Sequence, residues 1–205
     1  MSAHAAAPRQ PRWGFVELMV FVAGVSTLGA EIAAARLVAP AFGASTVVWA
    51  NTIAVVLVAL AGGYWLGGRL ADRHPHPSGM ARAALLGAAL VALIPLVAIP
   101  LLGATEDALT ELPGSLLALL VLVAPPVLVL GALSPWAIRL RVHAVEGAGD
   151  VTGRLYALST AGGLAGNFAA ALVLIPWVGT RWTFLICAAL LAAVSAPAAW
   201  SSRSA

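Results

Sequence analysis

The sequence predicts an all-α membrane protein, a polytopic bundle of about six transmembrane helices. The first observation is composition: 61% of the 205 residues are apolar and 9% are charged, whereas soluble proteins have roughly 45–50% and about 25%. The second is a series of apolar runs, each close to the roughly 20 residues that cross a bilayer as a helix. The third is that all 11 basic residues are arginines, mostly placed between those runs. A soluble catalytic domain is therefore excluded.

The apolar runs define the spans and the domain organisation. The expected spans cover residues 13–38, 45–66, 83–102, 115–138, 155–178 and 182–200. Residues 1–12 form an N-terminal tail, residues 13–200 form the transmembrane domain, and residues 201–205 form a C-terminal tail. The first run is too long for the core of a signal peptide, so we expect an uncleaved span. The Pro125-Pro126 pair predicts a kink in the fourth span; the alternative is two half-segments, each too short to cross.

The arginines predict the orientation. With a cytoplasmic N-terminus, nine of them lie inside, namely residues 9, 12, 69, 73, 82, 139, 141, 154 and 203. Only Arg36 and Arg181 fall outside. Because cytoplasmic loops are enriched in basic residues, we expect both termini in the cytoplasm and the chain in the inner (plasma) membrane, surrounded by lipid. A net charge of only +3 without a basic cluster argues against a nucleic-acid partner.

Polar residues inside the spans are the candidate binding residues, because an ionisable group in a bilayer is costly and usually functional. Glu31 lies deep in the first span, and Arg36, five residues later, is about 140° away round the helix. Glu31 therefore needs another partner, a proton or a bound cation. Asn51 and Asn167 lie at similar depth in other spans, so we expect all three in one substrate-binding pocket. The alternative for the asparagines is a set of hydrogen bonds that hold the bundle together.

Several other features point to structure rather than chemistry. Glu17 lies one turn from the end of its span, where it can reach the headgroups. The small-residue stripes Gly63/Gly67 and Gly162/Gly166 let helices approach closely. The single cysteine, Cys187, cannot form an intramolecular disulfide.

No catalytic or metal-binding set is apparent. His74 and His76 are separated by proline and lack a third ligand. We therefore expect no metal, no cofactor and no intrinsic enzymatic activity.

Two blocks of sequence carry a resemblance to a known family. The first block reads Glu31-Ile-Ala-Ala-Ala-Arg36, then Phe42-Gly43, then Gly63-Tyr64-Trp65-Leu66-Gly67-Gly68-Arg69-Leu70-Ala71-Asp72-Arg73. The second reads Gly131-Ala-Leu-Ser134-Pro135, then Gly153-Arg154-Leu-Tyr156-Ala-Leu-Ser159-Thr160, then Leu174-Ile175-Pro176. Together they resemble the membrane domain of the spermidine-synthase-like proteins, described as fused major-facilitator/spermidine synthases.

The resemblance implies a fold and a loop motif. It implies a bundle like half of a major-facilitator fold, without the soluble aminopropyltransferase domain, because the chain ends at Ala205 after the sixth span. The stretch from Gly68 to Arg73 is similar to the first half of the major-facilitator loop motif, in which Gly68, Asp72 and Arg73 would tie helix ends and gate the cytoplasmic side. The alternative is a solvated turn.

The expected functions follow from the resemblance and from the polar residues. The first is binding or transport of a small organic cation such as a polyamine, with Glu31, Asn51 and Asn167 as its ligands. The second is a membrane anchor or channelling partner for a separately encoded aminopropyltransferase, and the third is a structural subunit of a membrane complex. A half-transporter would expose its polar face to lipid, so we expect a homodimer or a heteromeric complex.

Overall fold

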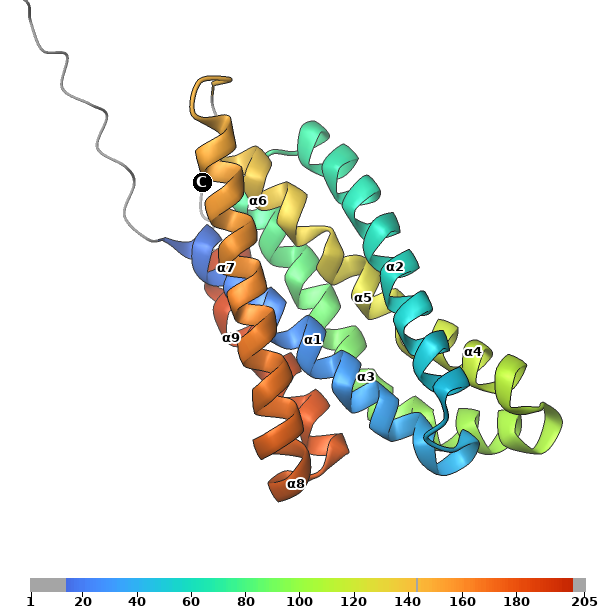
Figure 1. The fold of residues 1–205 in the computed structure, drawn as a ribbon. Helices are drawn as coiled ribbons and strands as arrows, with labels where there is room; N and C mark the ends of the chain where they lie inside the picture. Colours follow the sequence, from blue (N-terminus) through green and yellow to red (C-terminus); the bar gives the residue numbers. More distant parts are fainter. Residues whose placement is uncertain (1–13, 143, 201–205) are drawn as a thin grey trace, which may run out of the picture.

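The computed structural model describes residues 14–142 and 144–200, and the secondary structure of this part of the chain consists of helices joined by short turns (Figure 1). The helices in chain order are α1 (Phe15–Phe42), α2 (Thr46–Arg73), α3 (Pro77–Ala108), α4 (Glu111–Leu122), α5 (Ala124–Gly131), α6 (Leu133–Arg141), α7 (Ala148–Phe168), a π-helical segment η1 (Ala169–Leu174), α8 (Ile175–Val178) and α9 (Thr180–Trp200). The expected tails, residues 1–12 and 201–205, lie outside the described residues.

The helices are long and apolar enough to cross a membrane several times. Among the described residues, α1, α2, α3, α9 and the continuous run from Ala148 to Val178 each meet this condition. Helix α4 and the run Ala124–Arg141 meet it as a pair bent by 47°, which would make a sixth span. The break falls at Val123, two residues before the Pro125 and Pro126 pair, so the predicted kink is confirmed.

The helices extend past the expected span ends. Helix α2 continues to Arg73 and α3 begins at Pro77, although the apolar runs suggested ends near residues 66 and 83. Hydropathy marks where side chains become polar, whereas a helix ends where its backbone is capped. At the start of α2, the Ser45 hydroxyl accepts a hydrogen bond from the Val48 amide at 3.3 Å, and Pro77 occupies the first turn of α3.

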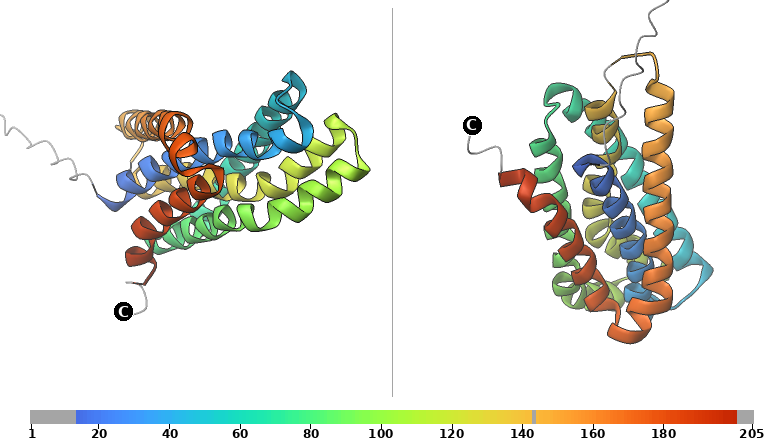
Figure 2. Two further views of the ribbon diagram at one scale, coloured as in Figure 1. Left: turned by 90° about the horizontal axis from the view of Figure 1, so that it is seen from below. Right: turned by 90° about the vertical axis from the view of Figure 1, so that its left-hand side faces the viewer.

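Helix α1 is the central helix of the bundle, and glycines bring its backbone against α7. A Cβ atom added at Gly162 or Gly166 would lie 2.2 or 2.1 Å from the carbonyl oxygen of Phe21 or Val25. These glycines are therefore required by direct backbone contact, which no side chain would permit. Figure 2 shows α1 enclosed by its neighbours along most of its length.

A second glycine contact joins α2 to the bent pair. A Cβ atom at Gly63 would lie 2.3 Å from the Leu128 carbonyl oxygen, and one at Gly67 would lie 2.4 Å from the Ala132 Cα atom. Both predicted stripes are thus packing surfaces, as expected. Their faces are filled by helices of this same chain, so these stripes do not offer contact surfaces for a second copy.

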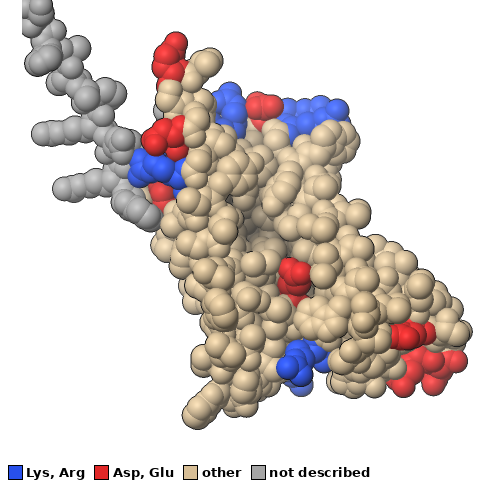
Figure 3. Space-filling model, in the orientation of Figure 1, with Lys and Arg blue, Asp and Glu red and all other residues tan. Residues whose placement is uncertain are grey.

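Charged residues gather at the two ends of the bundle. Six of the eight described arginines lie at the end where α1 begins, which we call the arginine-rich end: residues 69, 73, 82, 139, 141 and 154. Arg36 and Arg181 lie toward the opposite end, together with the acidic residues in the last turn of α3 and the first turn of α4. Figure 3 shows basic and acidic atoms at both ends of one face, with a largely uncharged surface between them.

Candidate functional site

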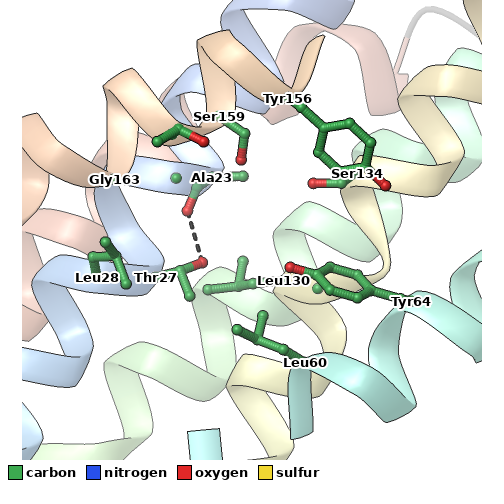
Figure 4. Close-up of a pocket in the computed structure, with 13 residues that line it drawn as sticks. Ala23, Thr27, Leu28, Leu60, Tyr64, Leu130, Ser134, Tyr156, Ser159 and Gly163 are labelled. Atoms are coloured by element: carbon green, nitrogen blue, oxygen red, sulfur yellow. Dashed lines mark hydrogen bonds between the residues drawn. The ribbon is translucent and has the colours of Figure 1, made fainter. Parts of the chain in front are cut away.

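A cavity of about 220 Å³ opens between five helices of the bundle. Its lining residues are Ala23, Gly24, Thr27 and Leu28 of α1, Leu60 and Tyr64 of α2, Leu130 and Gly131 of α5, Ser134 of α6, and Tyr156, Ser159, Thr160 and Gly163 of α7. In Figure 4, Tyr156 of α7 lies above Ser134 and Tyr64 of α2 lies below it, while the residues of α1 and Leu130 lie to the left of the two tyrosines. Helices α2 and α7 thus each contribute a tyrosine to the same part of the cavity.

Hydroxyl groups supply the side-chain polarity of this cavity. Six lining residues carry one, and none of the 13 carries a charge. The Thr27 hydroxyl donates to the carbonyl oxygen of Ala23 at 2.8 Å, which leaves the lone pairs of its oxygen available to accept. The cavity can thus accept hydrogen bonds but has no fixed counter-charge of its own.

Glu31 lies on α1 one turn beyond the cavity. It follows Thr27 by four residues and Leu28 by three, so all three side chains share one face of the helix. Glu31 is half-buried, and no hydrogen bond or ion pair joins its carboxylate to another residue in the described ranges 14–142 and 144–200. Arg36 is exposed and lies on another side of α1.

Asn167 occupies the corresponding place on α7. Gly163 approaches Leu28, since a Cβ added there would lie 2.9 Å from a Leu28 methyl carbon. Both α1 and α7 run from the arginine-rich end to the opposite end, so four residues after Gly163 the α7 helix presents Asn167 near the level of Glu31. Asn167 is half-buried. Helical spacing thus puts Asn167 at a level along the bundle similar to that of Glu31, one turn beyond the residues that line the cavity.

Asn51 lies apart from this pair. Its side-chain amide donates to the Leu112 carbonyl oxygen at 3.0 Å and to the Ser115 hydroxyl at 2.9 Å, which joins α2 to α4. It precedes the cavity residue Leu60 by nine positions, about 180° round the helix. Of the two readings offered by the sequence, the structure shows the interhelical hydrogen bond for Asn51, and it does not bring this residue to the cavity.

The predicted loop motif lies at the arginine-rich end of α2. Asp72 accepts a hydrogen bond from the Arg139 side chain of α6 at 3.1 Å, in an exposed ion pair. Arg73 is exposed in the last turn of α2, and Gly68 faces open space. Asp72 thus links the ends of two helices, although through Arg139, a residue that the motif does not include; the gating role stays a prediction.

Glu17 and Arg141 form a second ion pair at the same end. The two side chains approach to 2.5 Å and are 16% and 22% exposed, respectively. Glu17 also accepts from the Gly14 backbone amide at 3.0 Å, which caps the first turn of α1. Glu17 thus has a structural role, as expected, and it fulfils this role through its ion pair with Arg141 of α6.

Metal-binding geometry is absent from the described part of the chain: no three His, Cys, Asp or Glu residues there lie close enough to share an ion. Cys187 is buried in α9.

The tyrosines are the site residues that sequence reasoning missed. Tyr64 and Tyr156 are the two tyrosines of the chain, and both lie within the blocks that carry the family resemblance. Their sequence signal is weak because an aromatic residue near a span end also fits an interfacial anchor. Only the packing of α2 and α7 around α1 shows that both border one cavity.

The fold and the site define a class of protein: a helical, multi-pass membrane protein with a hydroxyl-lined cavity and an acidic residue beside it. No family model, no curated protein and no solved structure matches the chain.

Proposed function

We propose that this protein binds a small organic amine in its cavity, with Glu31 as the counter-charge of the ammonium group. The observation that carries the proposal is the half-buried Glu31 carboxylate, which has no ion-pair partner among the described residues. A charged group within a membrane span costs several kcal/mol unless it is compensated. A bound cation supplies that compensation.

The surroundings of Glu31 support an amine rather than a metal ion. Asn167 offers an amide oxygen on the facing helix, and the adjacent cavity offers hydroxyl oxygens. An ammonium group has three hydrogen-bond donors and no acceptor, so carboxylate, amide and hydroxyl oxygens suit it. The cavity of about 220 Å³ is smaller than the roughly 300–1,000 Å³ of drug-sized sites, which favours a small ligand. The family resemblance adds polyamines as the first amines to test.

The test is amine binding to purified protein in nanodiscs. We expect Glu31→Gln to lower the affinity for octylamine more than tenfold, about 1.4 kcal/mol, because the variant keeps the shape of the side chain and removes its charge. Glu106→Gln is the matched control: Glu106 is an exposed acid near the end of α3, and its substitution leaves the affinity unchanged. Equal affinities of Glu31→Gln and the parent protein would refute the proposal.

We further propose that the arginine-rich end faces the cytoplasm of a cell whose inner membrane holds the chain, in line with the distribution of basic residues. Asp107→Cys, at an exposed position in the last turn of α3 at the opposite end, then reacts with an impermeant thiol reagent added outside intact cells. Ala148→Cys, at the start of α7, reacts only after the membrane is opened. Labelling of Ala148→Cys from outside would show that the orientation is the opposite of the one proposed.

We also propose that a second copy or another membrane subunit covers the face that holds Glu31. Figure 3 shows one face of the bundle that is hollowed, with an acidic patch between the charged groups at its two ends. Lipid against that hollow would meet polar groups, at an energetic cost. Mass measurement in nanodiscs tests this assembly, and a monodisperse monomer that binds octylamine would rule it out.

A further inference from the structure

Six hydroxyl-bearing residues gather in the cavity, on the side of Glu31 toward the arginine-rich end. We call them the hydroxyl cluster: Thr27, Tyr64, Ser134, Tyr156, Ser159 and Thr160. They come from α1, α2, α6 and α7, so the fold brings together residues that are up to 133 positions apart in the chain. One ammonium group at Glu31 can use the hydroxyl of Thr27, one turn away on α1, and leaves the rest of this cluster without a role.

The two tyrosine hydroxyls of the cluster have free hydrogen-bonding capacity. Within the described residues, no hydrogen bond joins Tyr64 or Tyr156 to another side chain or to the backbone. Their residues are 45% and 51% exposed, and in Figure 4 both rings border the open space of the cavity near Ser134. A ligand can therefore reach the hydroxyl oxygens and the edges and faces of both rings.

The chemistry of the cluster suits a second cation. Hydroxyl oxygens accept hydrogen bonds from an ammonium group, and tyrosine faces attract a cation by about 0.5–2 kcal/mol. No basic residue lines the cavity. Arg154 precedes Tyr156 by two positions, about 200° round α7, so it lies on another side of that helix.

The spacing along the helices separates the carboxylate of Glu31 from the hydroxyl cluster. Thr27 lies about 6 Å from Glu31 along the axis of α1, and Gly24, which packs against Ser159, lies about 10 Å away. Apolar side chains, those of Leu28 and Leu60, line the same cavity. A linear ligand with a polar group at each end and methylene groups between them matches this spacing and this mixed lining.

We propose that the hydroxyl cluster is a second binding site, which holds the far ammonium group of a linear diamine whose first ammonium group pairs with Glu31. This inference rests on the proposed function, because the first ammonium group defines where the second one lies. The site then selects a ligand by its length and by what its second end carries.

The experiment compares three ligands of equal chain length on the protein in nanodiscs: octylamine, an amino alcohol with a terminal hydroxyl, and the diamine with ammonium groups at both ends. We expect the diamine to bind at least tenfold more tightly than octylamine, with the amino alcohol between them. Equal affinities for octylamine and the diamine would overturn the inference.

Variants separate the two sites. The double variant Tyr64→Phe, Tyr156→Phe removes two oxygens and keeps both rings, so we expect the diamine to lose at least fivefold in affinity while octylamine is unchanged. Thr105→Val, which removes a hydroxyl of α3 outside the cavity, is the control and changes neither affinity. If the double variant binds the diamine as the parent does, the hydroxyl cluster is not the second site, whereas the proposed function stands as long as Glu31→Gln still weakens octylamine.

Discussion

Two acidic residues of α1 lie in contrasting surroundings. Glu17, in the first turn, pairs with Arg141 of α6 and caps its own helix. Glu31, about four turns further along, is half-buried and has no ion-pair partner among the described residues. The same side chain thus joins two helices at one place and faces a cavity at the other. A carboxylate in a span is therefore a binding candidate only when the fold leaves it without a partner.

Loss of Arg141 is expected to have the largest effect on stability. Arg141→Ala leaves the Glu17 carboxylate largely buried and without its ion-pair partner, and we expect it to lower the free energy of unfolding by about 3 kcal/mol. Unfolding in mixed micelles, followed by circular dichroism, measures the change. A loss below about 0.5 kcal/mol would show that the pair contributes little.

Substitution of each carboxylate by its amide tests whether Glu17 and Glu31 contribute differently to stability. We expect Glu17→Gln to lower the free energy of unfolding by about 1–2 kcal/mol, because it weakens a charge-assisted hydrogen bond. Glu31→Gln removes a charge that has no described partner and causes no loss of stability. The same unfolding measurement on both variants decides the matter, and equal losses would mean that Glu31 also stabilises the fold.

Asn51 tests whether a polar residue that the sequence grouped with Glu31 belongs with it. Asn51→Ala removes the hydrogen bonds to α4 and leaves the Ser115 hydroxyl with one partner fewer. We expect a loss of about 1 kcal/mol in stability and an octylamine affinity within twofold of the parent. A tenfold loss of affinity at unchanged stability would place Asn51 in the binding site.

The smallest effect is expected at the exposed ion pair. Side chains of Arg139 and Asp72 are 48% and 73% exposed, and exposed pairs contribute about 0–1 kcal/mol because solvent screens them. Asp72→Asn should therefore change the free energy of unfolding by less than about 0.5 kcal/mol. If the loop motif nevertheless acts as a gate, the variant alters amine flux into liposomes while its stability stays the same.

Much of the fold follows from the sequence pattern, because a segment that crosses lipid must satisfy its backbone hydrogen bonds internally and so forms a helix. Apolar runs of span length, the Pro125-Pro126 kink and the close-packing roles of Gly63 and Gly166 depend on local chemistry that the sequence displays directly. The π-helical segment before Pro176 was not anticipated; proline lacks an amide hydrogen, so a widened turn next to it is a physical possibility that hydropathy does not indicate.

The site was harder to predict than the spans. Depth in the membrane can be read from residue count, and it placed Glu31, Asn51 and Asn167 at one level. Direction round the helix depends on which neighbours a helix packs against, and the packing of α2 on α4 turns Asn51 away from α1. The partner of Asp72 was missed for the same reason, since Arg139 lies 67 residues away in sequence.

The two glycine contacts have a mechanical consequence. Backbone lies directly on backbone between α1 and α7 at Gly162 and Gly166, and between α2 and the bent pair at Gly63 and Gly67. Such seams leave no side chains that can re-pack, so each joined set of helices moves as a rigid block. The cavity lies between the two blocks, with Tyr64 on one and Tyr156 on the other. A change in its width would therefore require a displacement of whole helices rather than the re-packing of single side chains.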